Sequence, residues 1–171
     1  MDILKSATDW AKAEVFSTSF FIVMGLVFVL ATIGFWQLGK TEIAKAYVIP
    51  TLVAGALLLT IGLGLFFTNK ARVNNFETAY NSNAKAFVAS EIVRADKALN
   101  EYRTIVFKAI PLIIAICALL IVFIDKPLWR ASMITTIAML VVILLIDGTA
   151  KGRLDTYKKQ LVEVQNRGEE Y

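Results

Sequence analysis

The chain has 171 residues, of which 57% are hydrophobic and 19% are charged, with a formal net charge of +4. About a quarter of the residues of a typical soluble domain are charged, so the composition excludes an ordinary soluble protein, and the length leaves room for one domain. The sequence has no His and a single Cys, Cys117. We therefore expect no zinc or haem site, no cofactor and no intrachain disulfide.

Residues 1–14 precede the first long apolar stretch and allow two interpretations. Ile3, Ala7 and Trp10 share one helical face, which is typical of an amphipathic helix lying in the membrane interface. A plain helical extension of the first span is the alternative. The acidic residues here and the length of the following apolar stretch argue against a cleavable signal peptide, so we expect the first span to be retained.

Four apolar stretches predict four membrane-spanning helices, because a span needs about 20 mostly apolar residues. They cover residues 15–39, 46–69, 105–124 and 129–147. The fold class predicted is therefore all-α, a polytopic membrane protein.

The second span carries small residues on one face, namely Thr51, Gly55 and Gly62. Small residues let helices approach closely in lipid, where no hydrophobic effect drives helices together. These three residues are candidates for packing against another span or against a second copy of the chain.

The polar segment 70–104 is predicted to be helical, with a turn at Asn81-Ser82-Asn83. Its apolar residues recur in steps of three and four, the spacing of a coiled-coil seam, and the C-terminal segment 148–171 repeats this pattern. The seam residues are Val88, Ile92, Leu99, Tyr102, Leu154, Tyr157 and Leu161. They predict a small helical bundle, and the spacing leaves open whether they pack within one subunit, between subunits or on a protein partner.

The third span contains Pro111, which would leave too short a helix if the span began there. A helix that continues from the polar segment and is kinked near Pro111 is expected instead, with Lys108 reaching towards the membrane interface. The tight polar turn Asp125-Lys126-Pro127 predicts that spans three and four form an antiparallel hairpin.

The distribution of basic residues predicts the orientation. Of the 18 Lys and Arg residues, Lys40, Lys45, Lys126 and Arg130 fall in the two short loops, Lys108 falls at the start of the third span, and all others fall in the termini or the central polar segment. The positive-inside rule then places both termini in the cytoplasm of a bacterium, with the spans in its inner membrane. The net positive charge is thereby explained by topology, so no nucleic-acid partner is expected.

Residues able to carry chemistry are scarce. Glu169-Glu170 is the only pair of adjacent carboxylates and is expected to belong to a solvated tail. No ionisable residue falls in the middle of a span, which argues against coupled transport through a buried carboxylate. The sequence therefore predicts that the protein is not an enzyme.

The span number, size and orientation resemble those of the small four-span immunity proteins that protect bacteria from pore-forming colicins, and of four-span subunits of anti-phage defence systems. This resemblance covers the layout alone and transfers no residue. It implies a non-enzymatic membrane protein that oligomerises, binds a protein partner, or both, in contact with membrane lipid. The alternative is a small homo-oligomeric ion channel lined by hydroxyl side chains.

Overall fold

The computed structural model describes residues 2–168 and is helical apart from short turns. Its elements in chain order are α1 (Ile3–Leu38), α2 (Glu42–Ala46), α3 (Val48–Ser82), α4 (Ala84–Glu101), the π-helical segment η1 (Tyr102–Ala109), α5 (Ile110–Phe123) and α6 (Pro127–Gly168). Four helical stretches are long and apolar enough to cross a membrane, and residues 2–168 contain no strand. The all-α class and the four apolar helices of spanning length are thus confirmed.

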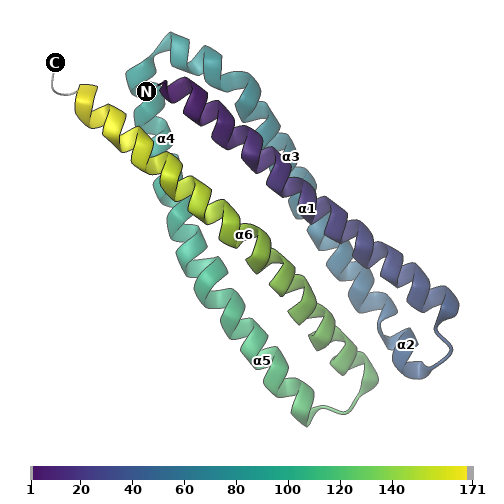
Figure 1. Ribbon diagram of the computed structural model, residues 1–171. Helices are drawn as coiled ribbons and strands as arrows, with labels where there is room; N and C mark the ends of the chain where they lie inside the picture. The colour runs from purple at the N-terminus through teal and green to yellow at the C-terminus, as the bar shows by residue number, and fades with distance from the viewer. Residues whose placement is uncertain (1, 169–171) are drawn as a thin grey trace.

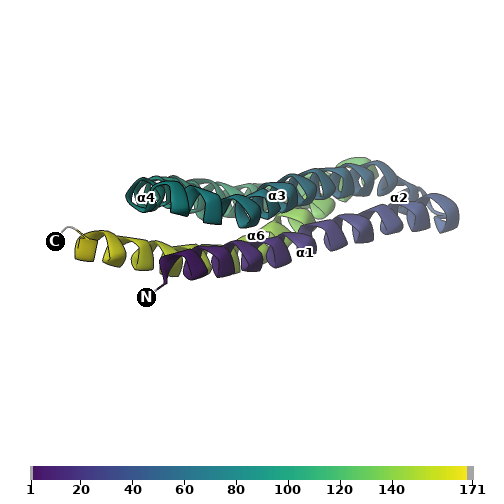
Figure 2. The same cartoon turned by 90° about the horizontal axis from the view of Figure 1, so that it is seen from above.

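Two long antiparallel hairpins make up the molecule (Figure 1). Helix α1 pairs with α3 and helix α5 pairs with α6, while the turn between α3 and α4 lies at the same end as the two termini. Seen from above, α3 and α4 lie on one side, and the C-terminal part of α6 lies beside the start of α1 (Figure 2). Four helical stretches therefore run side by side at the end that carries the termini.

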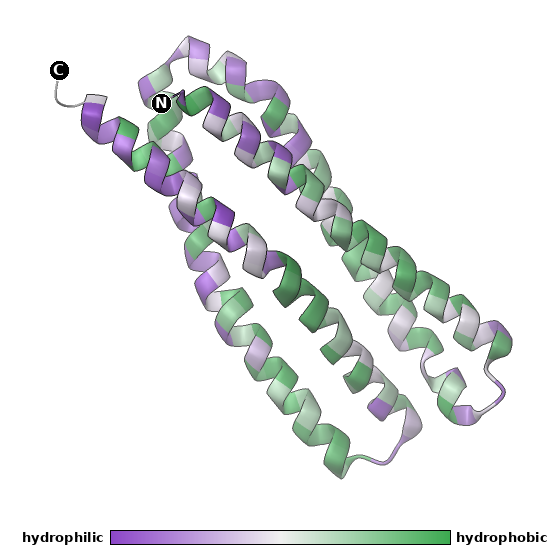
Figure 3. Cartoon of the chain, viewed as in Figure 1, coloured by the Kyte–Doolittle hydropathy of each residue, from purple (hydrophilic) through white to green (hydrophobic). Residues whose placement is uncertain are grey.

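Polar and apolar residues separate along the length of these helices (Figure 3). We call residues 2–14, 70–104 and 148–168 the polar half. The apolar half comprises residues 15–69 and 105–147. Each long helix passes from one half into the other without a break, so the two halves are joined by continuous helix.

Residues 3–14 form the first turns of α1 and are not a separate helix. Asp2 caps this helix, because its side chain accepts a hydrogen bond from the backbone N–H of Lys5 at 3.2 Å. Ile3, Ala7 and Trp10 are buried against other helices of the polar half. Of the two interpretations of residues 1–14, the structure therefore has the helical extension in place of the interfacial helix, and Met1 lies outside the described residues.

The helix that leads into α5 changes its hydrogen-bonding pattern just before Pro111. In the π-helical segment η1 the bonds span five residues, and the N–H of Ile110 donates to the carbonyl of Ile105. Proline lacks an N–H and its ring crowds the carbonyl four residues earlier, and a π-helical turn is one way to relieve that conflict. The expected helix across Pro111 is present, and its irregularity is a π-helical segment.

Short polar motifs end and restart the helices. Asn83 lies between α3 and α4, and its side chain accepts a hydrogen bond from the N–H of Ala86 at 2.9 Å. The turn predicted at Asn81-Ser82-Asn83 is thus a single extended residue. Pro127 begins α6, where proline is favoured in the first turn.

A core of large apolar side chains holds the polar half together. Its buried members come from α1, α3, α4 and α6: Ile3, Ala7, Trp10, Ala11, Phe76, Phe87, Val88, Ala95, Leu154, Tyr157 and Leu161. The four helices thus form a bundle at this end. A smaller cluster around Val106, Ile110 and Leu140 joins α5 to α6 in the apolar half.

Candidate functional site

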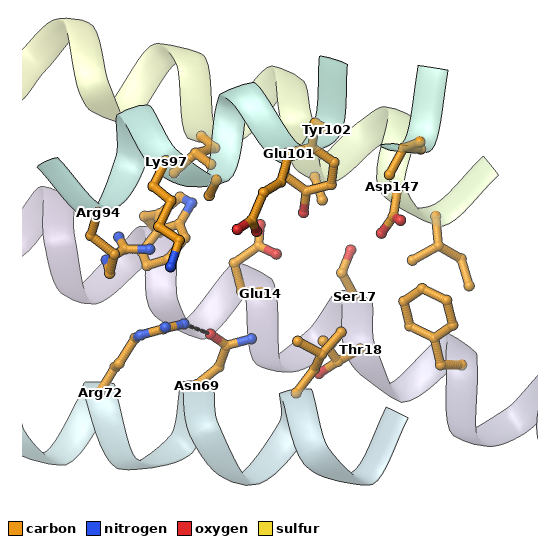
Figure 4. Close-up of a pocket in the computed structure, with 18 of the residues that line it drawn as sticks. Glu14, Ser17, Thr18, Asn69, Arg72, Arg94, Lys97, Glu101, Tyr102 and Asp147 are labelled. Atoms are coloured by element: carbon orange, nitrogen blue, oxygen red, sulfur yellow. Dashed lines mark hydrogen bonds between the residues drawn. The ribbon is translucent and has the colours of Figure 1, made fainter. Parts of the chain in front are cut away.

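A cavity of about 460 Å³ lies between the hairpins where the polar half meets the apolar half. Residues from α1, α3, α4, η1 and α6 line it (Figure 4). Its apolar wall includes Phe21, Leu65 and Ile105, and its polar wall carries both acidic and basic side chains. The cavity therefore combines a charged surface with an apolar surface that belongs to the apolar half.

Glu14 forms the first buried ion pair beside this cavity. Its carboxylate accepts hydrogen bonds from Nε and Nη2 of Arg153 at 3.1 and 3.0 Å, and Nη2 also donates to Oγ of Ser17 at 2.7 Å. Burial raises the pKa of the Glu14 carboxyl, although the neighbouring Arg153 acts in the opposite direction. The pair connects α1 to α6 at the boundary of the two halves.

Glu91 lies at the centre of a second network. It is buried, and it accepts two hydrogen bonds from Arg94 at 2.8 and 2.7 Å and one from the Tyr157 hydroxyl at 3.1 Å. Arg94 lies 4.4 Å from the centre of the Trp10 ring, which stacks on Tyr157 at 5.1 Å. Burial and the carboxylate of Glu91 raise the pKa of Tyr157, so its hydroxyl stays a proton donor.

Arg72 enters the cavity from α3. Its Nη1 donates to Oδ1 of the buried Asn69 at 2.6 Å. Burial lowers the pKa of Arg72, and the nearby positive charge of Arg94 lowers it further. Two guanidinium groups are therefore held near one another in a partly buried place.

Figure 4 shows how charge is distributed along the cavity. Arg72, Arg94 and Lys97 gather at one end, and Asp147 lies at the other. The carboxylates of Glu14 and Glu101 lie between them. The cavity is thus polarised, with a basic end suited to anions.

The small residues singled out in the second span all face α1. Added Cβ atoms at Gly55 and Gly62 would lie 2.9 Å from side-chain atoms of Val29 and Ile22. The hydroxyl of Thr51 hydrogen-bonds that of Thr32 at 2.9 Å. The structure therefore places these three residues in one close α1–α3 contact.

Gly25 of α1 belongs to the same contact and was not predicted. An added Cβ there would lie 2.7 Å from Cγ of Leu59. The first span also contains Gly34, where an added Cβ would meet nothing within 4 Å. No pattern in the sequence distinguishes Gly25, which lies in the contact, from Gly34, which does not.

The seven seam residues of the polar half all pack inside the chain. Val88, Leu154, Tyr157 and Leu161 are buried in its core, and the remaining three, Ile92, Leu99 and Tyr102, pack partly buried against it. Packing within one subunit is the arrangement that the structure has. The rest of the tail, residues 169–171 with Glu169 and Glu170, lies outside the described residues.

Sequence reasoning did not select the charged residues of the cavity as a site. Glu91 gave the clearest available signal, since it falls three residues after Val88 and four before Ala95, in the buried stripe of α4. A carboxylate in such a stripe needs a partner, and Arg94 one turn later provides it. Glu14 and Arg153 are 139 residues apart, so only the fold reveals their pairing.

No protein-family model, no curated protein and no solved structure matches the chain. The function has to be inferred from the arrangement of its own residues.

Proposed function

We propose that this chain is a non-enzymatic, multi-pass protein of the bacterial inner membrane that works by contact with other protein chains. Both termini lie in the cytoplasm in this proposal, since the polar half carries most of the Lys and Arg residues. The observation that supports protein contact best is the outward face of α5. It could receive a second copy of the chain, a different protein, or both.

Helix α5 is covered on one side only. Ile110 and Ile114 face α6. Leu112, Ile116 and Leu119 point away and, together with Phe123, are between 47% and 79% exposed. These outward residues recur in steps of four and three, which is the spacing of a helix–helix seam.

Lipid can cover an apolar helix face, but the continuous helix formed by α4, η1 and α5 has only a short uncharged stretch after Lys108. Its stretch from Ile110 to Phe123 is about 21 Å long, against roughly 30 Å of hydrocarbon. A short span is accommodated by bilayer thinning or by neighbouring protein. A second protein helix on this face would shield the flanking polar residues, including Lys108 and Asp125.

The finer form of this proposal is toxin immunity or an anti-phage defence subunit. The support is the small four-span layout together with a bulky apolar stripe exposed at membrane depth. A toxin helix inserted in the bilayer could pack against this stripe of α5 without leaving the membrane. Cells that express the chain are then expected to survive a cognate pore-forming toxin, and equal killing with and without the chain across candidate toxins would contradict the immunity form.

Disulfide crosslinking tests the contact directly. In a Cys117→Ala background, single cysteines replace Leu112 or Leu119 on the outward face of α5, and a control cysteine replaces Leu30 of α1, which is equally exposed. Oxidation of native membranes should link the α5 cysteines to a second copy or to a partner chain. Yields no higher than that of Leu30→Cys would show that lipid alone covers α5.

A second candidate function is a small homo-oligomeric pore. One observation favours it: Ser132, Thr135 and Thr136 line a cavity of about 220 Å³ between α3 and α6, and hydroxyl groups can line a wet path. Purified protein in liposomes should then conduct ions. Ion flux equal to that of empty liposomes over a range of voltage and pH would contradict this function.

A further inference from the structure

Two basic side chains of the cavity have no acidic partner. Arg94 is paired with Glu91, whereas Arg72 and Lys97 form no ion pair with any residue between 2 and 168. Arg72 donates to Asn69 through one nitrogen, which leaves its other N–H groups for a further acceptor. The basic end of the cavity thus offers donors that the described chain does not use.

Trp10 also lines this cavity. Its side chain is 8% exposed, and its indole nitrogen is the one buried side-chain N or O atom in residues 2–168 that has no hydrogen-bond partner. A buried donor without an acceptor is costly and uncommon in folded proteins.

The positive charges themselves favour the same conclusion. Burial lowers the pKa of Arg72, and repulsion between Arg72 and Arg94 across a partly buried space lowers it further, although the carboxylates of Glu91 and Glu14 act in the opposite direction. A negatively charged group between them would replace this repulsion with attraction. Figure 4 shows that Lys97 reaches towards the same end.

The acidic residues restrict where an anion can lie. Glu14 is neutralised by Arg153, and Asp147 lies at the opposite end of the cavity (Figure 4). Glu101 is exposed at the mouth and can turn towards water. An anion is therefore favoured at the basic end and repelled from the other.

We propose that the basic end of this cavity binds a phosphate group, held by Arg72 and Lys97, with Arg94 and the ring of Trp10 beside them. A phosphate has enough oxygen atoms to accept from all of these donors at once, and arginine matches its geometry. The group belongs either to a phospholipid headgroup, whose chains would lie along the apolar wall at Leu65 and Ile105, or to a soluble phosphate compound. This site does not depend on the function proposed above.

Tryptophan fluorescence measures this binding with Trp10 as the reporter. The substitutions Trp36→Phe and Trp129→Phe, at exposed residues far from the cavity, leave Trp10 as the only tryptophan. The full chain in maltoside micelles, which contain no phosphate, is titrated with sodium phosphate against sodium chloride of equal ionic strength. A second titration uses a short-chain phosphatidylglycerol against a phosphate-free glycolipid of the same chain length.

A saturable change of Trp10 emission is expected with at least one phosphate probe and with neither control. Saturation by inorganic phosphate assigns a soluble ligand, and saturation by the phospholipid alone assigns a headgroup. Arg72→Gln and Lys97→Gln should each raise the half-saturating concentration about tenfold or more. The matched controls Arg103→Gln and Lys85→Gln, at exposed residues outside the cavity, should leave it unchanged.

Two results would overturn the proposal. The first is no saturable change with either phosphate probe while circular dichroism shows a folded chain. The second is a change that Arg72→Gln and Lys97→Gln leave unaffected, because the phosphate would then bind elsewhere. Lys97 is exposed, so Lys97→Gln is expected to fold even if Arg72→Gln does not.

Discussion

In the polar half the buried residues are mostly large and apolar, whereas in the apolar half the closest helix contacts pass through glycines. Leu161 and Phe87 are typical of the first set, and Gly25 and Gly62 are typical of the second. Water drives large apolar side chains together, but lipid does not distinguish them from its own chains. A core of large apolar side chains at one end and close backbone approach at the other is the arrangement expected of helices whose apolar half lies in lipid.

The buried ion pairs are also unevenly distributed between the two halves. The buried networks around Glu14 and Glu91 lie in or beside the polar half. Paired charges there fix the helices relative to one another, whereas an unpaired charge within a membrane span would be costly. The cavity lies where the polar half meets the apolar half.

The largest loss of stability is expected from Leu161→Asp in the polar half. Leu161 is fully buried in the core of the polar half, so the new carboxylate has no partner and should lower the free energy of unfolding by about 4 kcal/mol or more. Limited proteolysis in detergent micelles should then cut α4 and α6 rapidly. Val93→Asp, at a 70% exposed residue of α4, is the control and should change stability by about 0.5 kcal/mol or less; equal protease sensitivity of the two variants would contradict a buried core here.

The next largest effect is expected from Glu91→Gln. The amide can still accept from the Tyr157 hydroxyl, but Arg94 loses its charged partner, which should cost about 3 kcal/mol. Reversible unfolding in mixed micelles, followed by circular dichroism, measures the change. The matched control is Glu163→Gln, which breaks an exposed pair with Arg167 and should cost about 0.5 kcal/mol or less. A Glu91 variant as stable as this control would mean that the buried network does not hold the polar half.

Gly62→Val tests the close contact between α1 and α3 in the apolar half. The added side chain would collide with Phe21 and Ile22 of α1, and overpacking of this kind costs about 1 to 2 kcal/mol. Gly64→Val, two residues along the same helix, meets nothing within 4 Å and is the control. The difference between the two unfolding curves measures the close contact, and coinciding curves would show that α1 and α3 separate without penalty.

The sequence was a good guide wherever one physical rule acts over a long stretch. The run from Val15 to Gly39 indicates a span by length alone, and the spacing of Val88, Leu154 and Leu161 indicates a buried helix face by period alone. Neither rule says what that face packs against, which is why the seam left several arrangements open. The Glu14–Arg153 and Glu91–Tyr157 contacts join residues far apart in the chain, so they depend on how the hairpins dock and not on any local pattern.

The smallest effect is expected from Thr51→Val, which keeps the shape of a residue in the α1–α3 contact and removes its hydroxyl. The hydroxyl of Thr51 bonds both Thr32 and the carbonyl of Tyr47, at 2.9 and 2.7 Å. Because the Thr32 hydroxyl is then free to donate to the carbonyl of Phe28, no buried hydroxyl is left without a partner, and the loss should be about 0.6 kcal/mol. Unfolding of Thr51→Val, Thr32→Val and the double variant in mixed micelles isolates the bond between the two side chains. A coupling energy above about 2 kcal/mol would mean that hydroxyl pairing, more than the glycines, holds the apolar half together.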